Sequence, residues 1–274
     1  MNDSTSRARV RAFYNDNPAR EWNRLSQSWL ECQITRQMID RVLTRPSRVL
    51  DIGGGPGVYA LDLAANGHRV DLVDLSSANI AFAKAKARER GVTLHSADVG
   101  DATCLRDHDT ETYDLILCLG PLYHLLEHDD RQRAVREAVR VLKPGGVGFF
   151  AYLSRYAPIF YQLKTDPEAI ADMEATIDTV LETGLHSPGA DDNRFFTDSC
   201  FVDPLTIGSD MGAFGLEEIC VFGAEGGMAQ SEAALLSLDD GARTAWQQVA
   251  LRLATTTVGA CGSEHVVYVG RKTR

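Results

Sequence analysis

Apolar residues follow two different spacings along this chain, and the two spacings alternate. Short apolar runs predict strands at residues 49–52, 69–75, 92–97, 113–119, 147–153, 216–222 and 265–272. Between them, apolar residues three and four apart predict helices. These helices cover residues 4–15, 18–43, 58–66, 78–90, 130–142, 167–182, 204–214 and one or two stretches within 231–257. Strands that alternate with helices are typical of an α/β protein with a parallel sheet.

Composition and charge narrow the class of protein further. The chain has 274 residues, 44% of them hydrophobic and 24% charged, which fits one large α/β domain with or without a lid. A net charge of −10 argues against a nucleic-acid-binding surface. No apolar run suits a membrane span or a signal peptide. The six cysteines form no C-x-x-C pair. We therefore expect reduced thiols in a cytoplasmic monomer or homodimer, without membrane or nucleic-acid partners.

The stretch VLDIGGGPG, residues 49–57, joins the first strand to a helix through a turn with four glycines in five positions. Glycine lets the backbone approach a ligand closely, and the N-terminus of the following helix offers free N–H groups. A dinucleotide-binding fold needs G-x-G-x-x-G. Here Gly53, Gly55 and Gly57 alternate, and Val58 stands where the third glycine of that motif belongs. The spacing therefore argues against a nicotinamide dinucleotide, although a glycine turn without any ligand is the simplest alternative.

With Asp51 two residues before Gly53, the motif D-x-G-x-G-x-G resembles the first motif of class I S-adenosylmethionine (SAM)-dependent methyltransferases. The sequence LGPLYHLL after the fourth strand and LKPGG before the fifth fall in the order typical of this family. The resemblance extends from about residue 14 to residue 272. It is strongest to bacterial small-molecule methyltransferases of the natural-product type, and it implies SAM as cofactor and S-adenosylhomocysteine as product.

The resemblance also implies the architecture. The fold expected is a Rossmann-like sheet in the order 3-2-1-4-5-7-6 with the last strand antiparallel, and the short final connection supports that direction. We expect a helical cover at residues 1–45, a cofactor-binding core at 46–153 and 205–274, and a lid inserted at 154–204. These parts together form one structural domain.

The cofactor contacts are predicted from strand ends and from the family. Asp51 holds the ammonium group of SAM, and Asp74, about twenty residues after the glycines, accepts the ribose hydroxyls. Asp74 as the cap of the next helix is the alternative, with Ser76 or Ser77 competing for that role. Asp98 contacts the adenine amino group, unless it only forms a local turn. The remaining cofactor contacts expected are Tyr14, Arg24, Leu75, Val99 and Leu119.

Methyl transfer from a sulfonium is an in-line displacement, so the enzyme mainly orients the acceptor and excludes water. If the acceptor must lose a proton, histidine is the usual base near neutral pH. His124, in the loop beyond the fourth strand, is the first candidate, with Tyr123 beside it, and His186 in the lid is the second. An aromatic-rich cover and lid on an acidic body favour a flat, neutral or weakly basic acceptor of aromatic or indole-like character. The acceptor contacts expected are Trp22, Tyr123, Arg155, Tyr156, Phe160 and Phe196.

Several other functions remain open at this stage. Residues 124–128 spell H-x-x-E-H, a zinc-site pattern, but their place after a cofactor-binding strand argues against a metal, and we expect none. A peptide or protein methyltransferase is one alternative, which an enclosing lid disfavours. A SAM-binding regulator without turnover is another. The oxidoreductase alternative is weakened by the missing third glycine.

Overall fold

The computed structural model describes residues 3–43, 45–188 and 196–273. Its sheet is built from the strands that the hydrophobic runs predicted, with the third displaced along the chain and the fifth longer than expected. The core strands are β1 (Arg48–Ile52), β2 (Arg69–Asp74), β3 (Ser96–Val99), β4 (Tyr113–Cys118), β5 (Leu142–Ser154), β8 (Leu216–Gly223) and β9 (His265–Lys272). The third strand begins at Ser96 rather than Val92, because the N–H of Val92 bonds to Ala87 at the end of a helix.

These strands pair in the order β3-β2-β1-β4-β5-β9-β8. Neighbours are parallel except β9, which runs antiparallel to both β5 and β8. The predicted order, with the last strand inserted antiparallel, is therefore confirmed. Asp51 of β1 lies level with Leu72 of β2 and Leu117 of β4, so the carboxyl ends of these strands meet at one edge. In open α/β sheets this edge is where ligands bind.

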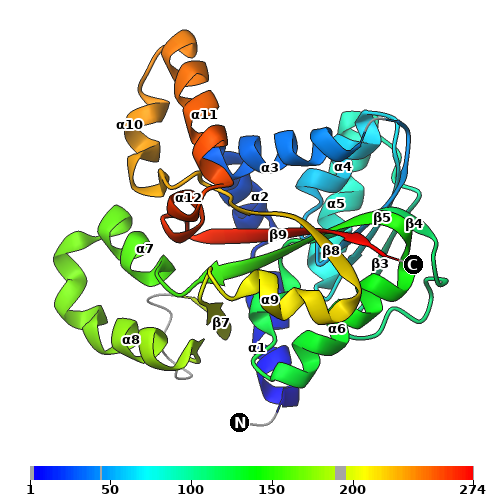
Figure 1. The fold of residues 1–274 in the computed structure, drawn as a ribbon. Helices are drawn as coiled ribbons and strands as arrows, with labels where there is room; N and C mark the ends of the chain where they lie inside the picture. Colours follow the sequence, from blue (N-terminus) through cyan, green and yellow to red (C-terminus); the bar gives the residue numbers. More distant parts are fainter. Residues whose placement is uncertain (1–2, 44, 189–195, 274) are drawn as a thin grey trace.

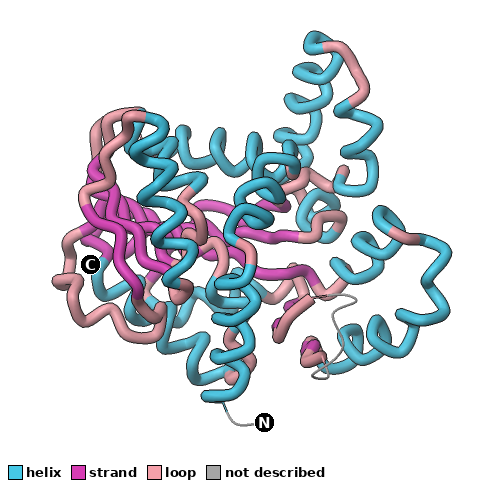
Figure 2. The backbone as a smooth tube through the Cα atoms, turned by 180° about the vertical axis from the view of Figure 1, so that it is seen from behind, coloured by secondary structure: helices cyan, strands magenta, loops and turns pink. Residues whose placement is uncertain are grey.

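Alternating side chains build a separate core on each face of the sheet. Leu115 and Leu117 of β4 pack toward one face, against α3 (Trp29–Val42), α4 (Val58–Ala65), α5 (Ser77–Arg90) and α11 (Asp240–Ala254). Ile116 and Cys118 pack toward the other, against α6 (His128–Val141) and α9 (Ile207–Met211). Figure 2 shows the strands between these helices. Burial on both faces explains why residues 113–119 form a nearly continuous apolar run.

The N-terminal segment forms α1 (Asp3–Asp16), α2 (Pro18–Gln27) and α3. The prediction of one helix over residues 18–43 was wrong, because the chain breaks at Ser28, whose ψ of 70° is not helical. The break lets α3 pack on the sheet while α2 turns Glu21 and Arg24 toward its carboxyl edge. Periodicity alone missed it, since both helices carry apolar residues at helical spacing.

The segment after β5 contains α7 (Ala157–Thr165), η2 (Pro167–Ala169), α8 (Ile170–Thr183), β6 (Leu185–His186) and β7 (Ser199–Val202). Two helices stand where one was predicted, and Figure 1 shows them to one side of the sheet (green). Strand β7 continues the sheet by pairing with Leu153 and Ser154 of β5, and β6 pairs with β7. Residues 189–195 of the predicted lid lie outside the described residues. That residues 154–204 act as a lid stays a prediction.

The remaining elements are short or stand apart from the sheet. They are η1 (Pro121–His124), η3 (Gly212–Phe214), η4 (Ala229–Ser231), α10 (Glu232–Leu236) and α12 (Thr257–Cys261). The predicted helix at 204–214 is therefore shortened to α9 and η3. Figure 1 shows α10 and α11 projecting from the sheet as an arm (orange). Among the described residues, no helix combines the length and the apolar character that a membrane crossing needs.

Candidate active site

The glycine turn between β1 and α4 is shaped by backbone conformations that other residues rarely adopt. Gly53, Gly55 and Gly57 have φ values of +65°, +57° and +84°. A Cβ on Gly53 would lie 2.2 Å from Cγ of Pro121, and one on Gly54 would lie 2.3 Å from Oδ2 of Asp51. The turn therefore presses its backbone against η1 on one side and the Asp51 carboxylate on the other. Gly57 caps α4 and packs on Ala83, so it supports the turn without lining the pocket.

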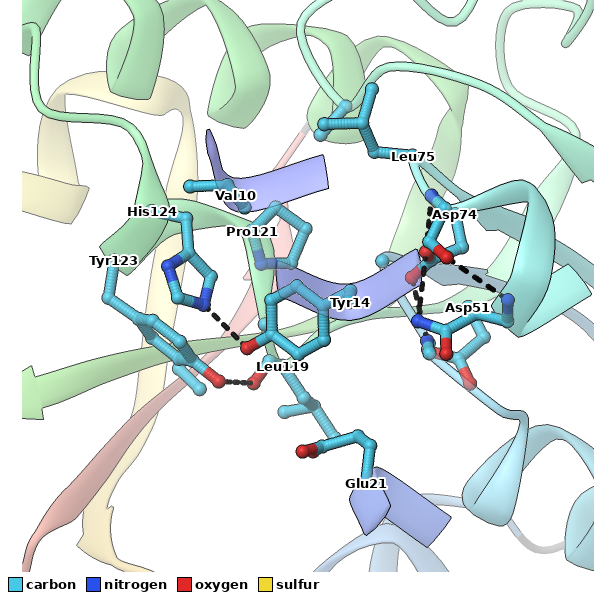
Figure 3. A pocket seen from close by; sticks show the side chains of 18 of the residues that line it. Val10, Tyr14, Glu21, Asp51, Asp74, Leu75, Leu119, Pro121, Tyr123 and His124 are labelled. Carbon is cyan, nitrogen blue, oxygen red and sulfur yellow. Dashed lines mark hydrogen bonds between the residues drawn. The ribbon is translucent and has the colours of Figure 1, made fainter. Parts of the chain in front are cut away.

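A pocket opens at this edge of the sheet, between the glycine turn, α1, α2 and η1 (Figure 3). It brings together ten of the predicted residues from five parts of the chain: Tyr14, Arg24, Asp51, Gly53, Gly55, Asp74, Leu75, Leu119, Tyr123 and His124. Further lining residues that the sequence did not single out include Glu31, Asn79, Asp101 and His265. One continuous cavity thus contains both the predicted cofactor contacts and the predicted base.

Asp51 is the most unusual carboxylate in this pocket. Its side chain is 1% exposed, and neither oxygen has a hydrogen-bond partner among the described residues. Burial, together with repulsion from Asp74, raises the pKa of Asp51 to about 7. A buried carboxylate without a partner is costly, so the site gains by binding a cation or a hydrogen-bond donor there. The ammonium group expected from the sequence has this chemistry.

Asp74 ties the glycine turn to α5. Its Oδ2 accepts the N–H of Gly55 at 2.8 Å, and its Oδ1 accepts the N–H of Ser76 and the amide of Asn79 at 2.8 and 3.2 Å. Burial raises its pKa in spite of these bonds. The helix cap proper is Ser76, whose hydroxyl accepts the N–H of Asn79. Asp74 therefore holds the turn in place, and its predicted role toward ribose stays a prediction.

The structure does not bring Asp98, the acidic residue expected beyond β3, into the pocket. Asp98 is exposed, Val99 is 57% exposed, and neither lines the pocket. The strand continues through Val99, which pairs with Asp74, so the chain turns only at Gly100. A Cβ on Gly100 would lie 2.7 Å from Val73, and the turn brings Asp101 to the pocket wall. There Asp101 forms an ion pair with Arg7 of α1 at 2.5 Å. The Gly-Asp pair was the signal available in the sequence.

His124 lies in η1, 7% exposed, with both ring nitrogens engaged. Nδ1 lies 2.9 Å from the carbonyl oxygen of Asp198, and Nε2 lies 2.7 Å from the hydroxyl of Tyr14. A carbonyl only accepts, so Nδ1 carries the proton and Nε2 accepts the Tyr14 hydroxyl. Burial lowers the pKa of His124 to about 4. Burial, followed by Glu21, raises the pKa of Tyr14 well above its ordinary value. Figure 3 shows this pair on the opposite side of the pocket from Asp51 and Asp74.

With this geometry in place, comparison with known proteins identifies the region around the glycine turn. A family model described as a methyltransferase domain matches residues 49–146. Residues 49–146 thus match a methyltransferase domain. The matched range begins in β1 and includes the glycine turn, Asp51, Asp74, Asp101 and His124. SAM is the cofactor of this family.

Relatives of the methyltransferase domain include two proteins named ubiquinone biosynthesis O-methyltransferase. The one from Paraburkholderia xenovorans is 32% identical over 157 residues, which are 57% of this chain and 62% of that protein. The one from Pseudomonas putida is 30% identical over 138 residues, 50% of this chain and 54% of that protein. The chain thus spans little more than half the length of these relatives.

Several solved structures share the fold of this chain but little of its sequence. A SAM-dependent methyltransferase from Methanosarcina mazei has a TM-score of 0.57 and 17% identity, with 86% of this chain and 97% of that chain covered. A methyltransferase from Haloferax volcanii, solved with its Trm112 activator, has a TM-score of 0.61 and 17% identity, with 97% and 98% covered. These likenesses, with the strand order, confirm the Rossmann-like methyltransferase fold.

Several residues predicted to contact the acceptor lie outside the pocket of the methyltransferase domain. Trp22 packs on Phe82 of α5, with Lys86 over its ring. Arg155, Tyr156 and Phe160 lie at and after the end of β5, where the chain turns away into α7. They belong to the inserted segment, none of whose described aromatic residues lines the pocket. An aromatic stretch in sequence does not reveal which way the helix that carries it faces.

His186 also lies away from the pocket. It sits in β6, where its Nε2 donates to the carbonyl of Phe196 at 3.1 Å. The prediction of His186 as a second base therefore does not agree with its position. Phe196 packs its ring 5.2 Å from the ring of His124, from outside the pocket lining. Both residues thus support the hairpin that carries Asp198 and do not face an acceptor.

An ionic cluster that the sequence did not predict lines the pocket beside Arg24. Nδ1 of His265 lies 2.7 Å from Glu225 and 3.9 Å from Glu31, and Arg24 lies 3.3 Å from Glu31. Burial alone would lower the pKa of His265, but Glu31 and Glu225 raise it to about 9. Burial likewise opposes ionisation of Glu31, yet His265 and Arg24 keep its pKa below its ordinary value. The cluster joins α3 to the start of β9, far apart in the chain.

The two histidines of the H-x-x-E-H pattern do not face a common site. His124 points to Tyr14, whereas His128 begins α6, is exposed and contacts Gln132. Among the described residues, the one group with ligand atoms close enough for a metal is Glu31, Glu225 and His265, within 4.8 Å of one another. Arg24 donates a hydrogen bond to Glu31 of this group. The positive charge of its guanidinium makes binding of a metal cation at this place unfavourable.

Proposed function

We propose that this chain is a SAM-dependent methyltransferase that acts on a small-molecule acceptor. The observation that carries the proposal is the buried, unpartnered Asp51 carboxylate beneath a glycine turn that a Cβ would fill. When bound, SAM supplies a methyl group on a positively charged sulfur, already activated for transfer to a nucleophile. The residues present fit such a molecule, because one end of the pocket is acidic and the other is aromatic and polar.

Each part of the cofactor has a proposed partner. Asp51 holds the ammonium group, and Asp74 accepts the ribose hydroxyls next to the apolar Leu75. Asp101 takes the adenine contact expected at Asp98, because Asp101 lines the pocket and Asp98 does not. Leu119 closes the cavity at the end of β4. Arg24 is held by Glu21 and Glu31, so its proposed contact with the cofactor is secondary.

The acceptor end is enclosed, which favours a small molecule over a peptide. Helix α1 covers it with Arg7, Val10 and Tyr14, and η1 forms the facing wall with Tyr123 and His124. The curated relatives are named for methylation of an oxygen in ubiquinone biosynthesis, which supports an acceptor of modest size. A flat acceptor of natural-product type, a cytoplasmic location and a monomeric or homodimeric state stay part of this proposal.

Calorimetry tests the cofactor proposal directly. The wild type is expected to bind SAM and S-adenosylhomocysteine but not NAD, and Asp74→Ala is expected to weaken SAM binding about 10- to 100-fold through lost charged hydrogen bonds. Asp98→Ala is the matched comparison, because Asp98 is exposed outside the pocket and its loss is expected to change nothing. Equal SAM binding by Asp74→Ala and wild type would contradict the ribose role. Preference for NAD would overturn the function itself.

Transfer of a labelled methyl group tests the acceptor class. With tritiated SAM, we expect label in small-molecule extracts and not in peptides. Label in peptides would favour a peptide methyltransferase. Binding of SAM without product in either fraction would favour a regulator that binds SAM without turnover.

A further inference from the structure

His124 and Tyr14 line the same pocket and are hydrogen-bonded to each other across it. The ring of His124 is almost fully buried, and the lone pair on Nε2 already accepts the Tyr14 hydroxyl at 2.7 Å. Tyr14 lines the cavity and is only half-buried. Its own oxygen keeps lone pairs free to accept a hydrogen bond from a bound molecule. Because both ring nitrogens of His124 are already engaged, the acceptor that the pair offers to a bound molecule is the oxygen of Tyr14.

The other ring nitrogen of His124 is fixed by the inserted segment. Nδ1–H donates to the carbonyl of Asp198, a fully buried residue just before β7. The carboxylate of Asp198 forms an ion pair with Arg9 of α1. Nη2 and Nε of Arg9 lie 2.9 and 2.8 Å from its two oxygens. Ser187 donates to the same carboxylate. Helix α1 thus holds both ends of the arrangement, through Tyr14 on one nitrogen and through Arg9 and Asp198 on the other.

We propose that Tyr14 and His124 form a proton relay for an acceptor with a hydroxyl group, and that Arg9 and Asp198 are its positioning residues. The inference deepens the proposed function and rests on it. As the acceptor oxygen bonds to the methyl carbon, the carbon–sulfur bond breaks and leaves its electron pair on sulfur. In the relay, the O–H bond of the acceptor then breaks and an O–H bond forms on Tyr14. The proton that Tyr14 gives up bonds to Nε2 of His124, which becomes an imidazolium ion. After the product leaves, that proton returns to solvent.

The electrostatics of the pair suit a hydroxyl better than an amine. The pKa of Tyr14 is raised and that of His124 is lowered, so both are neutral at pH 7. The charged groups around His124 are Glu21 and Arg24 of α2 and the Asp198 carboxylate, and burial outweighs them. Such a weak base takes a proton only from a strong acid. An oxygen becomes strongly acidic once it bonds to the methyl carbon, whereas a methylated amine keeps its proton.

The first test is nitrogen NMR of the histidines in the free protein. At pH 7 we expect His124 to be neutral, with the proton on Nδ1 and an Nε2 signal shifted by the Tyr14 hydroxyl. Tyr14→Phe should remove that shift, and Tyr161→Phe, a change on the surface of α7, should not. Arg9→Gln should give a mixture of both neutral tautomers, whereas Arg90→Gln on α5 should leave one. An imidazolium ion, or a proton on Nε2 in the wild type, would overturn the relay.

The second test separates relay from cofactor binding. We expect Tyr14→Phe to lower kcat at least about 100-fold while SAM affinity changes less than twofold. Arg9→Gln should lower kcat about tenfold with SAM affinity unchanged. Undiminished kcat in Tyr14→Phe would overturn the relay, and loss of SAM binding there would make Tyr14 a cofactor contact instead.

Simple catechols and benzylamines are the acceptor probes, and we expect methylation of the catechols. Methylation of the benzylamines alone would overturn the inference. If neither class is methylated, the NMR result decides. Failure of the wild type to bind SAM would overturn the proposed function, whereas SAM binding with the wrong tautomer would overturn the relay alone.

Discussion

The two ends of the pocket are built in different ways. At the cofactor end, each proposed contact comes from the carboxyl end of one parallel strand: Asp51 near the end of β1, Asp74 at the end of β2 and Leu119 just after β4. At the acceptor end, the contacts join segments far apart in the chain. Tyr14 and His124 are separated by 110 residues, and His124 and Asp198 by 74.

This difference determines what each end requires of the chain. The cofactor end depends on backbone conformations within one turn and on strand order, which the sheet sets as a whole. The acceptor end depends on α1, the inserted segment and η1 docking together, which has a larger loop-closure cost and few local signals. We therefore expect substitutions in the turn to abolish cofactor binding, whereas substitutions at the acceptor end should change turnover or stability first.

The largest effect is expected from Gly53→Ala. A Cβ there would lie 2.2 Å from Pro121, so η1 must shift, and SAM binding is expected to weaken more than about 100-fold. Gly67→Ala is the matched control, since Gly67 has a φ of +86° but no atom within 4 Å of the new Cβ. Both variants share a backbone strain of roughly 1–2 kcal/mol. Calorimetry should show normal SAM binding in Gly67→Ala, and equal loss in both would mean that strain, not contact with Pro121, is responsible.

The same contrast explains what the sequence could and could not predict. Asp51, Gly53 and Asp74 line the pocket as expected, because a motif and a strand end fix their positions locally. The sequence pointed to Asp98, but Asp101 lines the pocket instead, because β3 runs on to Val99 and strand ends are set by pairing rather than by composition.

At the acceptor end, His124 was found from its place beyond β4, but its partners were not. Arg9 and Asp198 carry no pattern of their own, and they meet only after α1 docks on the inserted segment. His186, Tyr156 and Phe160 were expected in the pocket because aromatic and titratable residues gather in their part of the chain. The orientation of that segment depends on tertiary packing, which hydrophobic periodicity does not predict.

A smaller effect, on the free energy of unfolding, is expected at the ionic cluster of His265, Glu31 and Glu225. His265 has its pKa raised to about 9 by Glu31 and Glu225, above its ordinary value near 6.5. The stabilisation is therefore complete below about pH 6.5 and is lost as the pH rises through 9, a change of about 3 kcal/mol in the free energy of unfolding. Urea unfolding at pH 6.5 and 10 should show this loss in the wild type and not in His265→Gln. The exposed His128→Gln should behave as wild type, and parallel curves for all three proteins would contradict the prediction.

The smallest effect concerns the pH dependence of cofactor binding at Asp51. In the free protein its pKa is about 7, raised by burial and by Asp74, so a bound ammonium group must displace its proton below that pH. SAM affinity should therefore fall about tenfold for each pH unit below 7 and level off above it. Asp51→Asn should bind more weakly but without this slope, because an amide has no proton to release. Adenosine, which lacks the ammonium group, should bind the wild type with no slope. Calorimetry in buffers of different ionisation enthalpy measures the released proton directly, and a slope that persists in Asp51→Asn would assign it to another group and leave the ammonium contact without support.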